Sequence, residues 1–163
     1  AFSGSTLQFK EATAATPGAR AWWGRVALSG AMRATPAFTA ISQVHITARD
    51  ASPATEILSN EIGIPHWVSS MFEMEGLAAD GEVELGPEKL SIRGFRVRGE
   101  GGSADMEFAR LGAKSEGAVH VGLGILGANF ALHDGNVRYI LIPASDWFVD
   151  ETARIRKLGR TGW

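Results

Sequence analysis

Residues 77–143 consist of short segments in which apolar and polar residues alternate, separated by glycines. In residues 90–93 and 104–108, apolar side chains recur at every second position with charged or small polar ones between them. Because successive side chains of a strand point to opposite faces, this period indicates half-buried strands of an antiparallel sheet. We therefore predict a mainly β fold of the α+β class, with a twisted or curved antiparallel sheet, two short helices in the middle and one C-terminal helix.

The length and charge of the chain restrict what it can do. With 163 residues it has the size of about one domain, and we treat residues 1–163 as a single β-rich domain that can bury its own core. Its apolar fraction of 45% and charged fraction of 21% are typical of soluble globular proteins. A net charge of −2 argues against nucleic acid as a partner, because such binding depends on neutralising phosphates.

Cysteine usage and hydropathy bear on the location of the chain. It has no cysteine, which excludes disulfides, thiolate chemistry and cysteine-ligated zinc but leaves the compartment open. No run approaches the ~18 apolar residues of a membrane-spanning helix, and we identify no signal peptide. The chain begins with Ala1 rather than methionine, so we expect a processed product or a fragment whose membrane anchor, if any, lies outside this chain.

The N-terminal part predicts strands at residues 6–10, 21–29 and 37–47, and the segment after it changes period. In the third strand, Phe38, Ala40, Val44 and Ile46 share one face. Ser52 followed by Pro53 is a typical helix start, and Gly63 ends that segment. A second helix is predicted from Pro65, with an apolar stripe formed by Trp67, Val68, Met71 and Phe72.

A change of phase at Gly94 predicts a β-bulge. Leu90 and Ile92 share one face, whereas Phe95 and Val97 fall on odd positions; one extra residue at Gly94 restores all four to the same side.

Charged residues cluster on the predicted strands. Arg93, Arg96 and Arg98 resemble a basic stripe, but Arg93 and Arg96 point to opposite faces unless a bulge intervenes, and acidic residues follow closely. We interpret this stripe as a solvated strand face. The pairs Glu73 and Glu75, and Glu82 and Glu84, are expected to be solvated rather than catalytic, because acid–base work needs environments that separate their pKa values.

A final helix is predicted at about residues 146–158. Ser145 is its expected N-cap and Gly159 the residue that follows its end. Acidic residues at its start and basic residues at its end complement the helix dipole.

Two patterns suggest cofactor or metal sites but lack the context they need. Residues 122–127, GLGILG, match a dinucleotide-binding fingerprint, yet a turn and another strand follow where that fingerprint requires a helix. A glycine-rich strand packed against a neighbouring backbone fits better. Among the histidines, only His120 and His133 can approach each other, across a hairpin near Asp134, and we favour solvated histidines over a metal site. We predict no cofactor and no metal, and we do not expect an enzyme.

The chain has more large apolar side chains than the core on one inner face of a sheet needs. Adjacent Trp22 and Trp23 must point to opposite faces of a strand, and the predicted helices carry further aromatic residues. Either helices cover the second sheet face, or an apolar groove or protein interface exists.

The chain resembles the AsmA-like bacterial envelope proteins, the bridge-like lipid-transfer family that includes TamB. The resemblance rests on Ser42 to Asp50 leading into IGIPHW at residues 62–67, on the strand series from Gly76 to Ala104, and on the strand GNVR at residues 135–138 with its terminal helix. It implies a curved sheet with an apolar face that conducts lipids across the periplasm, without catalytic residues. The shortness of this chain would make it one piece of such a groove.

These observations lead to two expectations of function. The first is a non-enzymatic domain of the bacterial periplasm or cell envelope, which holds lipid acyl chains or another apolar ligand and adjoins further domains of a larger chain. The second is an assembly module that docks a partner or a second copy, with no small ligand. The residues expected to form the apolar groove or interface are Trp67, Met71, Phe72, Leu90, Ile92, Phe95, Val97, Met106, Phe108 and Trp147. In a closed domain the strand residues among them would be an ordinary core.

Overall fold

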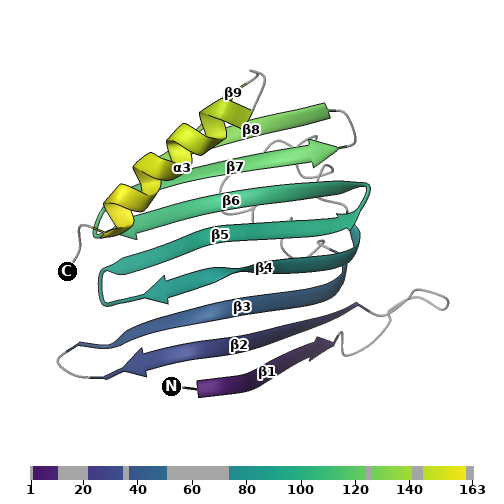
Figure 1. Ribbon diagram of the computed structural model, residues 1–163, viewed down its shortest axis with the longest axis vertical. Helices are drawn as coiled ribbons and strands as arrows, with labels where there is room; N and C mark the ends of the chain where they lie inside the picture. The colour runs from purple at the N-terminus through teal and green to yellow at the C-terminus, as the bar shows by residue number, and fades with distance from the viewer. Residues whose placement is uncertain are drawn as a thin grey trace.

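The computed structural model describes residues 2–10, 22–34, 37–50, 74–123, 126–140 and 145–160. They form one antiparallel sheet of nine strands and one C-terminal helix, as the alternating pattern predicts (Figure 1). The strands are β1 (Phe2–Lys10), β2 (Trp23–Arg33), β3 (Thr39–Asp50), β4 (Glu75–Leu85), β5 (Lys89–Glu100), β6 (Gly102–Leu111), β7 (Lys114–Leu123), β8 (Leu126–His133) and β9 (Asn136–Ile140).

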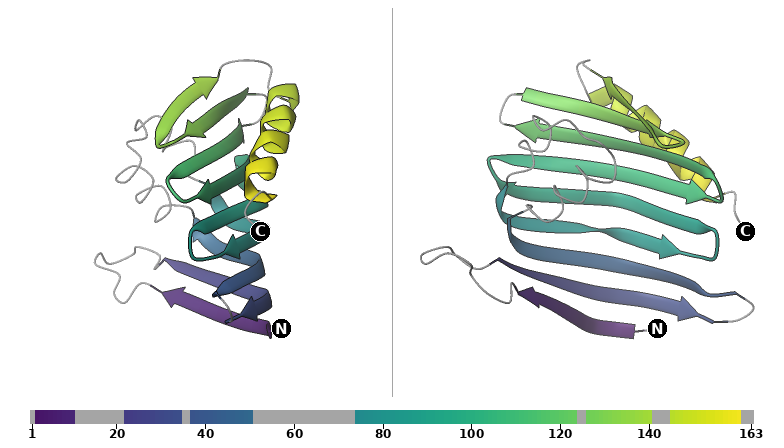
Figure 2. Two further views of the ribbon diagram at one scale, coloured as in Figure 1. Left: turned by 90° about the vertical axis from the view of Figure 1, so that its left-hand side faces the viewer. Right: turned by 180° about the vertical axis from the view of Figure 1, so that it is seen from behind.

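The sheet is an open meander in which each strand pairs with the next along the chain. The strand order is β1 to β9, with β1 paired only to β2 and β9 only to β8. Short hairpins join β4 to β5, β5 to β6, β6 to β7 and β8 to β9. Figure 2 shows the strands stacked into one twisted layer, with the two edge strands at opposite ends.

The pairing register gives the sheet one apolar and one polar face. Residues paired across an antiparallel ladder point the same way, so each face can be followed from strand to strand. The polar face, which also carries the helix, includes Gln43, Glu82, Arg93, Asp105 and Glu116. The larger side chains of the other face, called here the apolar face, are Leu7, Phe9, Val26, Leu28, Met32, Val44, Ile46, Leu77, Val83, Leu85, Leu90, Ile92, Phe95, Val97, Met106, Phe108, Val119, Val121, Phe130, Leu132, Val137 and Tyr139.

The bulge predicted at Gly94 is confirmed. The register of β5 against β6 shifts between Ile92 and Phe95, and Gly94 has a φ of +54°, in the region that favours glycine. The shift keeps Ile92 and Phe95 on the apolar face. It also places Arg93 and Arg96 on the same polar face.

One helix, α3 (Ser145–Arg160), lies diagonally across the polar face, mainly over β6 and β7 (Figures 1 and 2). Its start at Ser145 agrees with the sequence prediction. Its end does not, because the helix runs to Arg160 and Gly159 therefore lies inside it.

The three N-terminal strands are also confirmed, with different ends. Three of the six ends run further than predicted, because cross-strand pairing continues into residues whose own pattern is weak, such as Gly30 and Ala31, whereas β2 and β3 each begin two residues later. The two short helices predicted between Ser52 and Glu75 fall on residues 51–73, which lie outside the described residues, and Glu75 belongs to β4.

Candidate apolar binding face and its polar reverse

Six of the residues predicted to form a groove lie together on the apolar face. Leu90, Ile92, Phe95 and Val97 come from β5, and their cross-strand neighbours Met106 and Phe108 come from β6. The bulge at Gly94 is what keeps the β5 row continuous across the middle of the sheet. Although these strands are central in the sheet, all six side chains remain partly accessible. They form a continuous apolar surface rather than a sealed core.

Burial on the apolar face is uneven. Towards the β9 side, Ala104, Val121, Ala128 and Phe130 form a buried cluster, with Val97, Val119 and Val137 packed around it. The rings of Phe130 and Tyr139 meet edge to face at 5.4 Å. Towards β1, large side chains of the same face are about half exposed, as in Leu7 (53%), Phe9 (50%) and Met32 (57%).

The structure separates Trp147 from the six strand residues. Trp147 packs on the polar face with Phe148 and Leu158, against a buried cluster of Ala109, Ala118 and Ile155. These two alanines provide a small apolar platform among charged neighbours on which α3 docks. The other predicted groove residues, Trp67, Met71 and Phe72, lie outside the described residues.

The adjacent residues Trp22 and Trp23 lie on opposite faces of the sheet, as predicted. The ring of Trp22 lies over Gly24, a residue of the apolar face, where a Cβ would approach the ring to 2.5 Å. Its indole N–H donates to the carbonyl of Asp50 at 3.2 Å. Trp23 is 45% exposed and pairs with Lys10.

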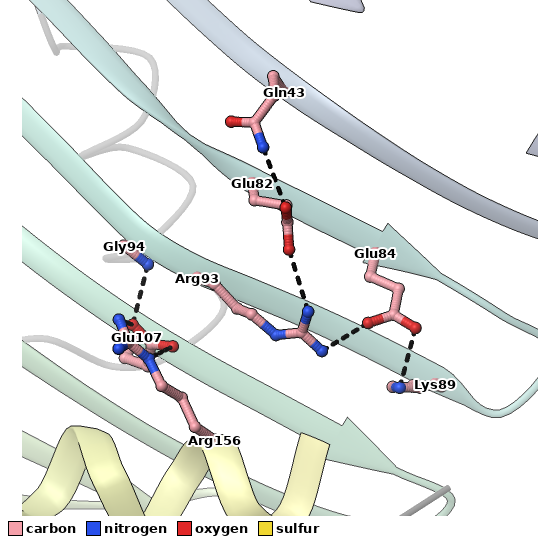
Figure 3. Close-up of polar contacts among 8 residues, drawn as sticks. All are labelled: Gln43, Glu82, Glu84, Lys89, Arg93, Gly94, Glu107 and Arg156. Atoms are coloured by element: carbon pink, nitrogen blue, oxygen red, sulfur yellow. Dashed lines mark hydrogen bonds and ion pairs between the residues drawn. The ribbon is translucent and has the colours of Figure 1, made fainter. Parts of the chain in front are cut away.

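The polar face carries a network of charges across β3, β4 and β5 (Figure 3). Arg93 donates to Glu82 at 3.0 Å and to Glu84 at 2.6 Å, and Lys89 donates to Glu84 at 2.9 Å. Gln43 donates to the other oxygen of Glu82 at 3.0 Å. The prediction that Glu84 is solvated is wrong, since the residue is only 3% exposed. Two cations donate to its carboxylate and compensate its buried charge, so Glu84 is not a free acid or base.

Two further buried carboxylates hold α3 on this face. Glu107 is 2% exposed and accepts hydrogen bonds from Arg156 at 2.8 and 3.1 Å. It also accepts one from the backbone N–H of Gly94 at 2.9 Å, so the bulge and the helix share one partner (Figure 3). The bond to Glu107 raises the pKa of the Arg156 guanidinium.

Glu116 makes the second anchor. It accepts hydrogen bonds from Arg154 at 2.6 Å and from His133 Nδ1 at 2.7 Å. The bond from Arg154 is the main cause that lowers the pKa of the Glu116 carboxyl below its usual 4.5, against the opposing effect of burial. Glu116 therefore stays ionised and binds the helix.

The cofactor and metal patterns do not assemble into sites. Gly122 pairs with Gly127 across the β7–β8 hairpin, and a strand follows where the dinucleotide fingerprint needs a helix. His120 lies opposite Asn129 and bonds it at 2.8 Å. His133 lies opposite Glu116, which precedes His120 by four residues on β7, so the two histidines are not neighbours. Within the described ranges, no group of three metal-ligating side chains comes together.

Sequence reasoning missed the buried charges on the polar face. Glu84, Glu107 and Glu116 follow the same alternation as exposed acids, so their period gives no sign of burial. The sequence contains one indication of this burial: basic residues occur in the strand or helix that packs beside each of these glutamates. The partner of each glutamate can be identified only when the strand register is known.

Comparison with protein-family models, characterised proteins and solved structures finds no match to this chain. Over the residues that the structure covers, no helix has the length and hydropathy needed to cross a membrane. The fold and the two contrasting faces are therefore the basis for any functional argument.

Proposed function

We propose that this chain is a non-enzymatic domain of a bacterial envelope protein, located in the periplasm, whose apolar sheet face holds or conducts lipid acyl chains. One observation carries the proposal: the register gathers most of the large apolar side chains of nine consecutive strands on one face, while most of the charged residues lie on the other. A bound acyl chain needs a long, uncharged, partly accessible surface of this kind.

The size of the face supports a ligand of that length. Neighbouring strands lie ~4.8 Å apart, so nine strands give a face about 40 Å wide. Monomers rarely expose large continuous apolar patches without a partner or ligand. Large side chains on the accessible part of this face include Leu7, Phe9, Met32 and Leu85.

Native mass spectrometry of the purified chain, together with organic extraction of the same sample, tests the proposal. We expect mass adducts that match lipids recovered in the extract. A matched pair of variants locates them: Met106→Asp places a charge on the apolar face and should abolish the adducts, whereas Ser29→Asp at an exposed position of the polar face should keep them. A lipid-free wild type that also fails to take up added lipid would refute the proposal.

The edge strand β1 favours a second candidate, assembly with another copy of this chain. β1 pairs on one side only and has no charged residue before Lys10; its register irregularity lies between Phe2 and Ser5, so residues 5–10 form a regular edge. Proteins usually protect exposed edges with charges, prolines or bulges. An antiparallel β1–β1 contact would extend the sheet with its apolar faces on the same side. A concentration-dependent dimer that Gln8→Lys dissociates would support this candidate, and a strict monomer would exclude it.

A further inference from the structure

We propose that Arg110 binds the anionic headgroup of the lipid, so that the ligands of the apolar face are negatively charged amphiphiles. This inference rests on the proposed function and specifies the ligand of the same face. Arg110 lies near the end of β6, beside the β6–β7 hairpin, and its side chain is exposed.

Arg110 breaks the chemical pattern of the apolar face. Across the ladders from Leu77 to Tyr139, the register assigns no other charged side chain to that face. Its cross-strand neighbours there are Leu90 on β5 and Ser115 on β7. Arg110 is exposed, so its charge is hydrated when no ligand is bound; a lipid with an anionic headgroup gains a charge-assisted pair there while its chain lies on the neighbouring apolar residues.

The structure supplies no such partner from the described residues. Arg110 has no ion pair or hydrogen bond with any of them. In contrast, the central arginines of the polar face pair with carboxylates, as in Arg93 with Glu82 and Glu84, and Arg98 with Asp105. Three strand arginines of the polar face, Arg25, Arg33 and Arg138, also have no ion pair among the described residues; their pairing with Thr47, Thr39 and Ala131 places them on that face. Arg110 is therefore available to a ligand on the apolar side.

The row of side chains that starts at Arg110 has the length of an acyl chain. Phe108 and Met106 follow it on the same face of β6 and are partly accessible, whereas Ala104 beyond them is buried. At ~3.4 Å per residue, the distance from Arg110 to Met106 is about 14 Å. One leaflet of a bilayer has a hydrocarbon depth of about 15 Å, so most of a chain anchored at Arg110 can lie on this accessible row.

The headgroup chemistry follows from the guanidinium. Arginine donates paired hydrogen bonds that match the oxygens of a phosphate or carboxylate. The hydroxyl of Ser115, beside it on β7, is a further donor at the same end of the face. We assign the ligand class as lipids with a phosphate or carboxylate headgroup, rather than neutral lipids.

Hexadecyl phosphate and hexadecanol test the inference, because they share a hexadecyl chain and differ in the headgroup, which is an anionic phosphate in one and a neutral hydroxyl in the other. Calorimetric titration below their aggregation concentrations should show the wild type binding the phosphate about tenfold more tightly, as expected for charge-assisted hydrogen bonds. Arg110→Gln should lose this preference while keeping its affinity for hexadecanol. Arg110→Lys, which keeps the charge, should retain part of it, and Arg33→Gln should behave as wild type. Inorganic phosphate alone should not bind measurably, since the hexadecyl chain contributes most of the affinity of hexadecyl phosphate.

The outcomes separate this inference from the function on which it rests. Equal binding of the two amphiphiles to wild type, or a preference that persists in Arg110→Gln, overturns the role of Arg110 and leaves acyl binding intact. Binding of inorganic phosphate as tight as that of hexadecyl phosphate would mean a free-anion site instead. Failure of both amphiphiles to bind overturns the proposed function, and this inference with it.

Discussion

At the scale of single residues, Gly94 connects the two faces of the sheet. Its positive φ makes the bulge that keeps Ile92 and Phe95 on the apolar face, and its N–H binds Glu107 on the polar face. An alanine at this position meets no atom within 4 Å, so any effect of the substitution reports backbone strain rather than a clash.

Gly94→Ala should lower the free energy of unfolding by about 1–2 kcal/mol, the cost of a left-handed conformation for a residue with a Cβ. Urea denaturation measures it. Gly86→Ala is the matched control, because Gly86 lies in a turn without positive φ and its added Cβ would make only an ordinary contact at 3.5 Å. Equal stability of the Gly94→Ala protein and wild type would contradict the assigned bulge.

Glu116 makes the free energy of unfolding depend on pH in the acidic range. Its pKa is below the usual 4.5 in the folded chain, mainly because Arg154 bonds its ionised form. The stabilisation is thus present above that ordinary pKa and is lost as the pH falls through the folded pKa. We expect Glu116→Gln to show a smaller loss of unfolding free energy than wild type between about pH 5 and about pH 3.

The control for this pH dependence is Glu88→Gln. Glu88 is exposed in the β4–β5 turn, and its carboxylate has no ion pair among the described residues. Its variant should follow the wild-type curve of urea-derived stability against pH. A Glu116→Gln curve parallel to wild type would show that the bond to Arg154 contributes nothing to folding.

At the scale of elements, helix α3 docks on a face that is otherwise charged. Its apolar contact is small, since Ile155 lies on Ala109 and Ala118, and its ion pairs with Glu107 and Glu116 border this contact. The alanines matter because a larger side chain on β6 or β7 would lift the helix away from its carboxylate partners.

Ile155→Ala should destabilise the protein by about 2–5 kcal/mol, as expected for a truncated buried side chain. The residue is 1% exposed, whereas Val149 on the same helix is 65% exposed. Val149→Ala should therefore change the unfolding free energy by less than about 0.5 kcal/mol. Similar effects of the two substitutions in urea denaturation would mean that α3 does not dock through Ile155.

Much of the element structure could be predicted from sequence because it depends on local patterns. The period of two locates the strands, and the phase change at Gly94 locates the bulge. The face used by Trp147 could not be predicted, since it depends on Ala109 and Ala118, which look like ordinary small strand residues until α3 is placed over them. The burial of Glu84 likewise depends on Lys89 and Arg93 from the next strand.

At the scale of the whole molecule, the open meander explains why the two faces differ. Each strand contributes alternate side chains to each face, and a consistent register carries this difference through eight consecutive ladders. The polar face is stabilised by ion pairs and by α3. The apolar face has a buried cluster on β6 to β8, and its large side chains become more accessible towards β1.

The most direct test of the acyl-binding account is photocrosslinking with a fatty acid that carries a diazirine along its chain, followed by peptide mass spectrometry. We predict crosslinks at residues of the apolar face, such as Ile92, Phe95, Met106 and Phe108, and competition by unlabelled fatty acid. Residues of the polar face, such as Gln43, should remain unlabelled. Crosslinks confined to the polar face or to the outer surface of α3, or labelling that unlabelled fatty acid does not reduce, would contradict the central claim.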